Sequence, residues 1–165
     1  MPISPYLKKL REKIGHDPVL VPGVCVVIFN EKGEVLLHRQ SDDGRWHSIG
    51  GSIDPHEEPG AAALREAKEE TGVEVILERV VSVYAGPYPT YNNGDEVMFV
   101  SIAFAARLPA GVEPRVGDDE SLEMRFFKVT ELPELWEWDR RAVLEAAKGN
   151  AAAAFYDPPS SQKPV

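Results

Sequence analysis

Three glutamates in one short segment are the first residues whose types and spacing suggest chemistry. Residues 65–72 read REAKEETG and include Glu66, Glu69 and Glu70. In a helix, residues three and four positions apart share a face, where like charges destabilise the helix by about 0.2–0.5 kcal/mol per pair. Magnesium takes oxygen ligands and bridges protein carboxylates to substrate phosphates. A bound cation would offset the repulsion, so a metal site is one explanation of this spacing and a solvated charged helix face is the other.

The glycines upstream place these glutamates in a longer pattern. From Gly51 to Val73 the chain reads GSIDPHEEPGAAALREAKEETGV. These 23 residues resemble, at every fixed position, the Nudix box that is the signature of Nudix hydrolases. The resemblance implies an α/β (α+β) fold, a Nudix-type α/β/α sandwich with a mixed β-sheet, and it extends more weakly over about residues 19–148.

The resemblance also implies roles for the matching residues. The implied metal ligands are the three glutamates and the backbone carbonyl of the residue before the box: Gly50, Glu66, Glu69 and Glu70. Arg65 and Glu57 match a supporting pair in which the arginine orients carboxylates, and Gly51 and Gly72 are the box glycines. The implied cofactor is Mg²⁺, with Mn²⁺ as the alternative. A solvated charged helix face would explain an isolated E-x-x-E-E, but the complete box favours the metal site.

The box departs from the usual family pattern at its first glutamate and at its entry. His56 stands where the family usually has glycine, and Glu58 stands where a small helix-capping residue is usual. Glu58 is a poor side-chain cap, although its charge suits a helix N-terminus. Ser48 and Ile49 replace the common Leu-Pro before the two glycines. None of these changes removes a metal ligand.

A general base for the attacking water has two candidates. Glu66 belongs to the box, whereas Glu120 lies in the acidic segment GDDESLE, on a loop that supplies a metal ligand or base in several family members. A solvated acidic turn is an equal alternative for Glu120. The sequence alone does not decide between Glu66 and Glu120.

The resemblance implies hydrolysis of a nucleoside diphosphate linked to another group, and ADP-ribose or a nucleotide sugar is the leading substrate class. Arg39 is expected near the substrate phosphates, with a surface salt bridge as the alternative. Tyr91 could stack on a base. Pro89 and Tyr91 match the markers of two different subfamilies, so oxidised (d)NTP and dinucleoside polyphosphate substrates also stay open. A nucleotide-sensing module without catalysis is the alternative of another class.

The surrounding pattern predicts the elements that position the box. A short helix begins at Ser4-Pro5 and ends at Gly15, and a second helix spans Pro59 to Thr71. Strands are expected over residues 19–29, 34–40, 73–83, 95–107 and 124–129, with a short strand and glycine turn over 45–53 and a last helix over 133–148. The predicted organisation is an N-terminal helix and connector (1–18), a Nudix hydrolase domain (19–150) and a disordered tail (151–165).

Composition narrows the partners. The chain has 165 residues and a net charge of −9, which argues against a broad nucleic-acid-binding face and leaves a small nucleotide as the expected partner. No apolar run is long enough for a membrane span, and the first residues lack a secretory signal, so a cytoplasmic location is expected. The lone Cys25 lies in an apolar stretch and is expected to be a buried structural thiol. A homodimer through the N-terminal helix and apolar strands is left open.

Overall fold

The computed structural model describes residues 4–86, 93–117 and 121–149. In chain order its elements are α1 (Pro5–Ile14), β1 (Val19–Phe29), β2 (Val35–Gln40), β3 (Trp46–His47), β4 (Ile49–Ser52), α2 (Pro59–Thr71), β5 (Ile76–Ala85), β6 (Val97–Arg107), β7 (Ser121–Phe127), the 3₁₀ turn η1 (Val129–Glu131) and α3 (Glu137–Ala147). The expected mixed α/β fold is confirmed. Four details differ from the predicted elements: residues 45–53 form two short strands, the strand predicted over 73–83 spans Ile76–Ala85, β7 begins before residue 124, and the last helix begins at Glu137.

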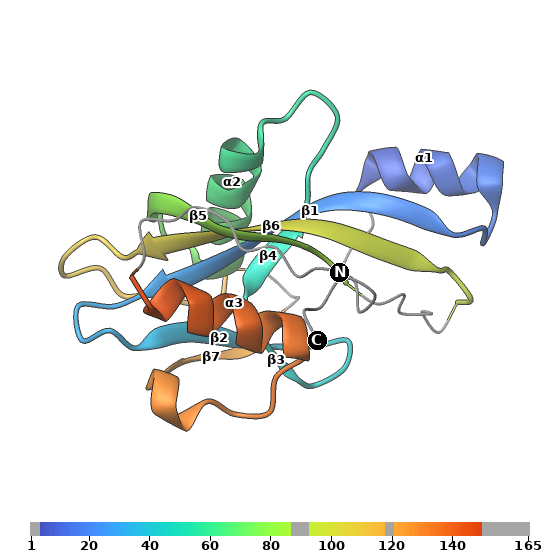
Figure 1. Ribbon diagram of the computed structural model, residues 1–165. Helices are drawn as coiled ribbons and strands as arrows, with labels where there is room; N and C mark the ends of the chain where they lie inside the picture. The colour runs from blue at the N-terminus through green and yellow to red at the C-terminus, as the bar shows by residue number, and fades with distance from the viewer. Residues whose placement is uncertain (1–3, 87–92, 118–120, 150–165) are drawn as a thin grey trace, which may run out of the picture.

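The strands form one mixed sheet of seven strands (Figure 1). Strand β1 is central: it runs parallel to β6 from Val19↔Val97 to Phe29↔Arg107, and antiparallel to β4 on its other edge. Strands β1 and β2 pair only where they meet at Phe29↔Val35, and β2 then pairs with β3 and β7. This register places the glycines of β4 directly beside β1.

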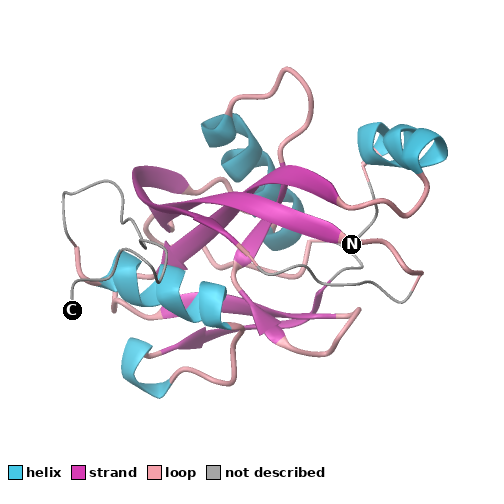
Figure 2. Cartoon of the chain, turned by 45° about the vertical axis from the view of Figure 1, so that its right-hand side comes forward, coloured by secondary structure: helices cyan, strands magenta, loops and turns pink. Residues whose placement is uncertain are grey.

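Helices α2 and α3 lie on opposite faces of the sheet, as Figure 2 shows. The side chains of β1 alternate between two apolar clusters, because successive residues of a strand point to opposite faces. Val24, Val26 and Ile28 pack with the alanines of α2, whereas Cys25 and Val27 pack with those of α3. The predicted burial of Cys25 is confirmed. The result is the three-layer α/β/α arrangement, with the box helix held against the sheet by its alanine face.

Local sequence sets the limits of α2. Pro59 occupies the first turn, and Gly72 ends the helix with φ of 69° while its N–H donates to the Lys68 carbonyl oxygen at 2.9 Å. This left-handed residue after the helix is the position where glycine is favoured. Glu58 makes no side-chain capping hydrogen bond, as expected from its length. The box helix therefore has a well-defined end and a weakly capped start.

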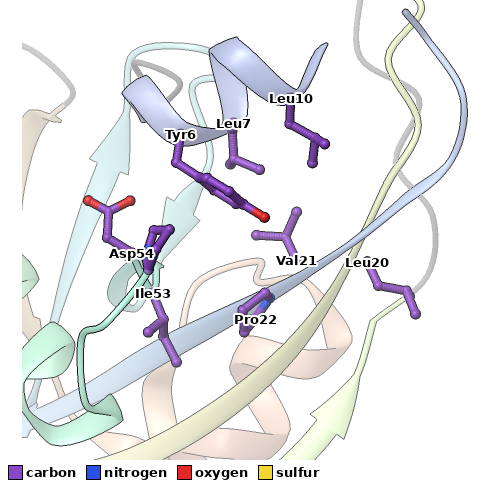
Figure 3. Close-up of a pocket in the computed structure, with 9 residues that line it drawn as sticks. Tyr6, Leu7, Leu10, Leu20, Val21, Pro22, Ile53 and Asp54 are labelled. Atoms are coloured by element: carbon purple, nitrogen blue, oxygen red, sulfur yellow. The ribbon is translucent and has the colours of Figure 1, made fainter. Parts of the chain in front are cut away.

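Helix α1 lies above the start of β1, at one end of the sheet (Figure 1). Ser4 caps it, and Arg11 ties its end to the body by donating to the backbone oxygens of Asp17 at 2.6 Å and Glu96 at 2.9 Å. Between α1 and β1 lies an apolar hollow of about 260 Å³, shown in Figure 3. None of the helices in the described ranges is long and apolar enough to cross a membrane.

Candidate active site

Arg65 organises the acidic face of α2. Its guanidinium holds Glu57 through two hydrogen bonds of 2.8 and 2.9 Å. The same group donates to Glu66 Oε1 at 2.8 Å, to Glu69 Oε2 at 3.2 Å and to the Ser52 carbonyl oxygen at 3.0 Å. One cation thus joins three carboxylates to the end of β4. Charge-assisted bonds of this kind fix orientation as well as adding attraction.

Glu70 points the other way, into the protein. Its carboxylate is 2% exposed, and Oε2 accepts a hydrogen bond of 3.4 Å from the Gly50 N–H. His38 of β2 lies 3.8 Å from the same oxygen and is itself hydrogen-bonded to Ser121 at 2.7 Å. Burial lowers the pKa of His38 to about 4, so its imidazole is neutral near pH 7. The neutral imidazole of His38 therefore does not supply a positive charge to Glu70.

Gly50 and Gly51 allow β4 to approach its neighbours closely. A Cβ on Gly50 would overlap the backbone carbonyl oxygen of Val24, and a Cβ on Gly51 would overlap the carboxylate of Glu66. Side chains are thus excluded at both positions for steric reasons. The structure brings together the backbone at Gly50, the backbone at Gly51 and the carboxylates of Glu66 and Glu70.

The carboxylates in this cluster differ in their protonation behaviour. Burial raises the pKa of Glu66, although the hydrogen bond from Arg65 opposes this effect. The Arg65 hydrogen bonds lower the pKa of Glu57. Glu57 is therefore a fixed anionic partner of Arg65, whereas Glu66 is the carboxylate whose proton affinity is increased by its environment. That is the property expected of a base that works near neutral pH.

The turn before α2 explains one departure from the family pattern. The Glu57 N–H donates to the Asp54 carbonyl oxygen at 3.0 Å, which closes a four-residue turn with Pro55 second and His56 third. His56 has φ of 70°, and among the described residues it is the only one other than glycine with positive φ. A positive φ at the third position is typical of type II turns, where glycine is preferred.

We expect His56→Gly to raise the free energy of unfolding by up to about 1 kcal/mol. A left-handed non-glycine residue costs about 1–2 kcal/mol, and glycine loses about 0.5–1 kcal/mol through unfolded-chain entropy. Urea unfolding of both proteins measures the difference. His56→Ala is the matched control because it keeps the Cβ, and an equal gain in that variant would contradict the backbone explanation.

The remaining predicted residues are not all at this site. Arg39 makes an ion pair of 2.9 Å with Glu123 of the neighbouring strand β7, which is the salt bridge weighed as its alternative role. Its neighbour His38 faces Glu70, so strand alternation directs Arg39 to the opposite face of the sheet. Glu120, Tyr91 and Pro89 lie outside the described residues.

The structure adds residues that the sequence pattern did not reveal. The Gly117 N–H donates to the Glu70 carbonyl oxygen at 2.8 Å, and the Arg115 N–H donates to the Thr71 carbonyl oxygen at 3.0 Å. On the other face of the sheet, Asp139 of α3 accepts a hydrogen bond of 3.1 Å from the Ser48 N–H. The acidic residue in the first turn of α3 could have been noticed, but its partner 91 positions away could not.

Oxygen donors of this type suit a hard divalent cation. Arg65 shows that Glu66 and Glu69 can converge on one positive group, and Glu69 is free to turn because its side chain is 56% exposed. Across the described ranges, no three His, Cys, Asp or Glu side chains are already grouped closely enough to hold a metal ion. These oxygen donors therefore fit a divalent metal ion, and the exposed Glu69 carboxylate would turn towards the ion when it binds.

Comparison with known proteins relates the chain to one protein family. The family model described as NUDIX domain matches residues 19–147. A MutT-like protein of Streptomyces ambofaciens is 34% identical over 108 residues, which cover 66% of this chain and 64% of that protein. The dihydroneopterin triphosphate diphosphatase of Escherichia coli (strain K12) is 32% identical over 76 residues, covering 45% of this chain and 49% of the relative. The chain thus spans less than two thirds of the length of these relatives.

Solved structures show the same fold. The MutT protein from Methanosarcina mazei Go1 superposes with a TM-score of 0.66 at 21% identity, covering 82% of this chain and 99% of that chain. A MutT NUDIX hydrolase from Burkholderia pseudomallei gives a TM-score of 0.64 at 25% identity, covering 77% and 98%. With the box in register on α2, the domain match and these superpositions show that the chain belongs to the Nudix family.

Proposed function

We propose that this chain is a metal-dependent pyrophosphohydrolase acting on a nucleoside diphosphate linked to another moiety, with ADP-ribose or a nucleotide sugar as the substrate class. The observation that carries the proposal is the carboxylate cluster of α2, in which Arg65 gathers Glu57, Glu66 and Glu69. An ordinary solvated helix face would not place Glu70 in a buried contact with β4. Family membership supports the reaction class.

Glu66, Glu69, Glu70 and the carbonyl oxygen of Gly50 would hold the metal, for which magnesium is proposed and manganese is the alternative. A bound divalent ion supplies charge neutralisation of the diphosphate and a more acidic water. The chain's own groups do the rest. Arg65 orients the carboxylates, and Glu66 or Glu120 accepts the proton of the attacking water. The raised pKa of Glu66 supports its candidacy.

Glu120 stays the alternative base because of the residues that flank it. Gly117 contacts the last turn of α2, and Ser121 contacts His38 beside Glu70. Both described ends of the segment are thus attached next to the acidic cluster. Tyr91 and Arg39 are proposed to contact the base and the phosphates. For Arg39, which points to the face of the sheet opposite Glu70, this requires exchange of its Glu123 ion pair and a change in the direction of its side chain.

A substrate panel tests the proposal. Purified protein with Mg²⁺ is incubated with ADP-ribose, nucleotide sugars, dinucleoside polyphosphates and ordinary and oxidised (d)NTPs, and released phosphate and nucleotides are measured. Preference for ADP-ribose or a nucleotide sugar supports the proposed class. Preference for an oxidised (d)NTP or a dinucleoside polyphosphate would select the alternative pyrophosphatase. Tight nucleotide binding without turnover would instead favour the sensing module, a reading disfavoured by the intact box carboxylates. We also propose that the protein is cytoplasmic and forms a homodimer.

A further inference from the structure

The short segment from Ser48 to Gly51 is held by one carboxylate from each side of the sheet. On the α2 side, Glu70 Oε2 accepts from the Gly50 N–H at 3.4 Å. On the α3 side, Asp139 Oδ1 accepts from the Ser48 N–H at 3.1 Å. Asp139 is 5% exposed and Ser48 is 7% exposed, so the contact between them is shielded from water. The backbone that carries the proposed metal-binding carbonyl therefore has a second anchor outside the box.

Asp139 lies next to a chain of polar and charged groups. Its Oδ2 lies 3.4 Å from His47 Nδ1, and His47 Nε2 lies 3.2 Å from Asp43 Oδ2. Asp43 in turn accepts a hydrogen bond of 2.9 Å from the Arg45 N–H. Burial lowers the pKa of His47, but its bonds and charge interactions with the two aspartates outweigh burial and raise it above the ordinary value. The imidazole thus lies between two carboxylates that favour its charged form.

The start of α3 is also attached rigidly to the strands it faces. Trp46 of β3 bridges to Leu135, just before the helix. Trp136 stacks on Trp138 with ring centroids 4.9 Å apart, and the Arg45 guanidinium lies 4.3 Å from the Trp136 ring centroid. Stacked aromatic and cation–π contacts of this kind hold side chains in defined orientations. Asp139 therefore projects from a helix start that has little freedom to follow a displaced strand.

Strand β4 has little room to absorb a displacement of Ser48 by local adjustment. Gly50 lies against the Val24 carbonyl oxygen, where a Cβ would overlap backbone that cannot move alone, and Gly51 lies against the end of the Glu66 side chain. A shift of the segment would therefore move the Gly50 carbonyl relative to the carboxylates of α2. A displacement of about 1 Å at a reacting site can cost about 100-fold in rate.

We infer that Asp139 is a positioning residue for the proposed metal site: through the Ser48 N–H it sets β4, and with it the Gly50 carbonyl, against Glu66 and Glu70. The inference rests on the proposed function for its consequence, since that function makes Gly50 a metal ligand. The hydrogen bond from the Ser48 N–H to Asp139 does not depend on that assignment. Replacing a residue that orients a metal ligand through a hydrogen bond typically weakens metal affinity by about 10–100-fold.

The test compares four full-length variants with the wild type. Asp139→Ala removes the acceptor, Asp139→Asn keeps an oxygen acceptor for the Ser48 N–H, and Asp139→Glu keeps the charge but moves it by one methylene. Glu137→Gln is the matched control, because it removes an exposed acidic charge from the same first turn of α3. Three quantities are measured: Mn²⁺ affinity by paramagnetic resonance titration, the amide chemical shifts of Gly50 and Gly51 in metal-free protein, and kcat and KM separately.

We expect Asp139→Ala and Asp139→Glu to weaken Mn²⁺ binding about tenfold, to shift both glycine amides and to lower kcat more than they raise KM. Asp139→Asn and Glu137→Gln should stay near the wild type in Mn²⁺ affinity, in the two glycine amide shifts and in kcat and KM. Thermal unfolding shows which variants are folded. If Asp139→Ala is unfolded, the comparison of Asp139→Asn with Asp139→Glu still tests the inference. A wild-type-like Mn²⁺ affinity and unchanged amide shifts in Asp139→Glu would overturn the inference, and a raised KM alone would assign Asp139 to substrate contact.

The design separates this inference from the function on which it rests. A wild-type protein that binds no Mn²⁺ and hydrolyses nothing would refute the proposed function. The Gly50 and Gly51 amide shifts would still report whether Asp139 sets β4. Conversely, strong activity with unaltered shifts in the Asp139 variants would leave the function standing and refute the positioning role.

Discussion

Glu69→Gln should lower kcat/KM at least about 100-fold, a loss of about 3 kcal/mol of transition-state stabilisation. The substitution keeps the size of the side chain and removes the charge that a hard cation requires. Glu69 is the cleanest choice among the three glutamates because its side chain is 56% exposed and its described partner is Arg65, at 3.2 Å. Steady-state kinetics with Mg²⁺ on the best substrate of the panel measures the effect.

The same substitution should leave the stability of the metal-free protein nearly unchanged. An exposed ion pair contributes at most about 1 kcal/mol, and removing one of several like charges from a helix face returns a few tenths of a kcal/mol. The matched control is Glu74→Gln, which removes an exposed carboxylate just beyond the same helix, paired with Lys68 at 2.6 Å. A sharp fall in Tm for metal-free Glu69→Gln would mean that the glutamate supports the fold rather than the chemistry.

Gly51→Ala and Gly50→Ala should separate activity from stability. At Gly51 the added methyl meets the end of the Glu66 side chain, which can move aside. We expect a fold of nearly normal stability and a loss of about 100-fold in kcat, because Glu66 is displaced from its position near β4. At Gly50 the methyl meets the backbone oxygen of Val24 within the sheet, which cannot move alone.

Gly50→Ala should therefore lower the free energy of unfolding by about 1–3 kcal/mol or more, as overpacking of a rigid site does. Urea unfolding and kinetics on both variants test the contrast. Gly60→Ala is the control for adding a methyl group nearby, since the closest atom to a Cβ there is a Leu77 methyl at 4.0 Å. Equal loss of stability in Gly51→Ala and Gly50→Ala would show that Glu66 is as fixed as the backbone.

Burial explains why Glu70 is a less direct test than Glu69. Glu70 is a hydrogen-bond acceptor for β4 as well as a proposed ligand, so its replacement changes the position of Gly50 and the charge together. The sequence alone treats the two residues as equivalent members of one acidic face. Only the packing of α2 on the sheet shows that one of them points to solvent and the other into the protein.

Local signals in the sequence were sufficient for the box helix and the central strand. Pro59 and Gly72 mark the ends of α2 because proline suits a first turn and glycine suits the left-handed residue after the last one, and the helix spans Pro59–Thr71 as predicted. The β-branched and aromatic side chains of residues 19–29 give β1 its predicted limits. The last helix begins later than predicted, at Glu137, because Leu135 just before it pairs with Trp46 of β3.

By itself, the sequence determined the family resemblance, the fold class and the residues that carry the acidic cluster, because these depend on residue types at short, fixed spacings. The tertiary structure decided which carboxylate is buried, that Arg39 pairs with Glu123, and that Asp139 and Gly117 contact the ends of the site. These features join residues far apart in the chain. Their contacts depend on how α2, α3 and β4 pack across the sheet, and no local pattern records that packing.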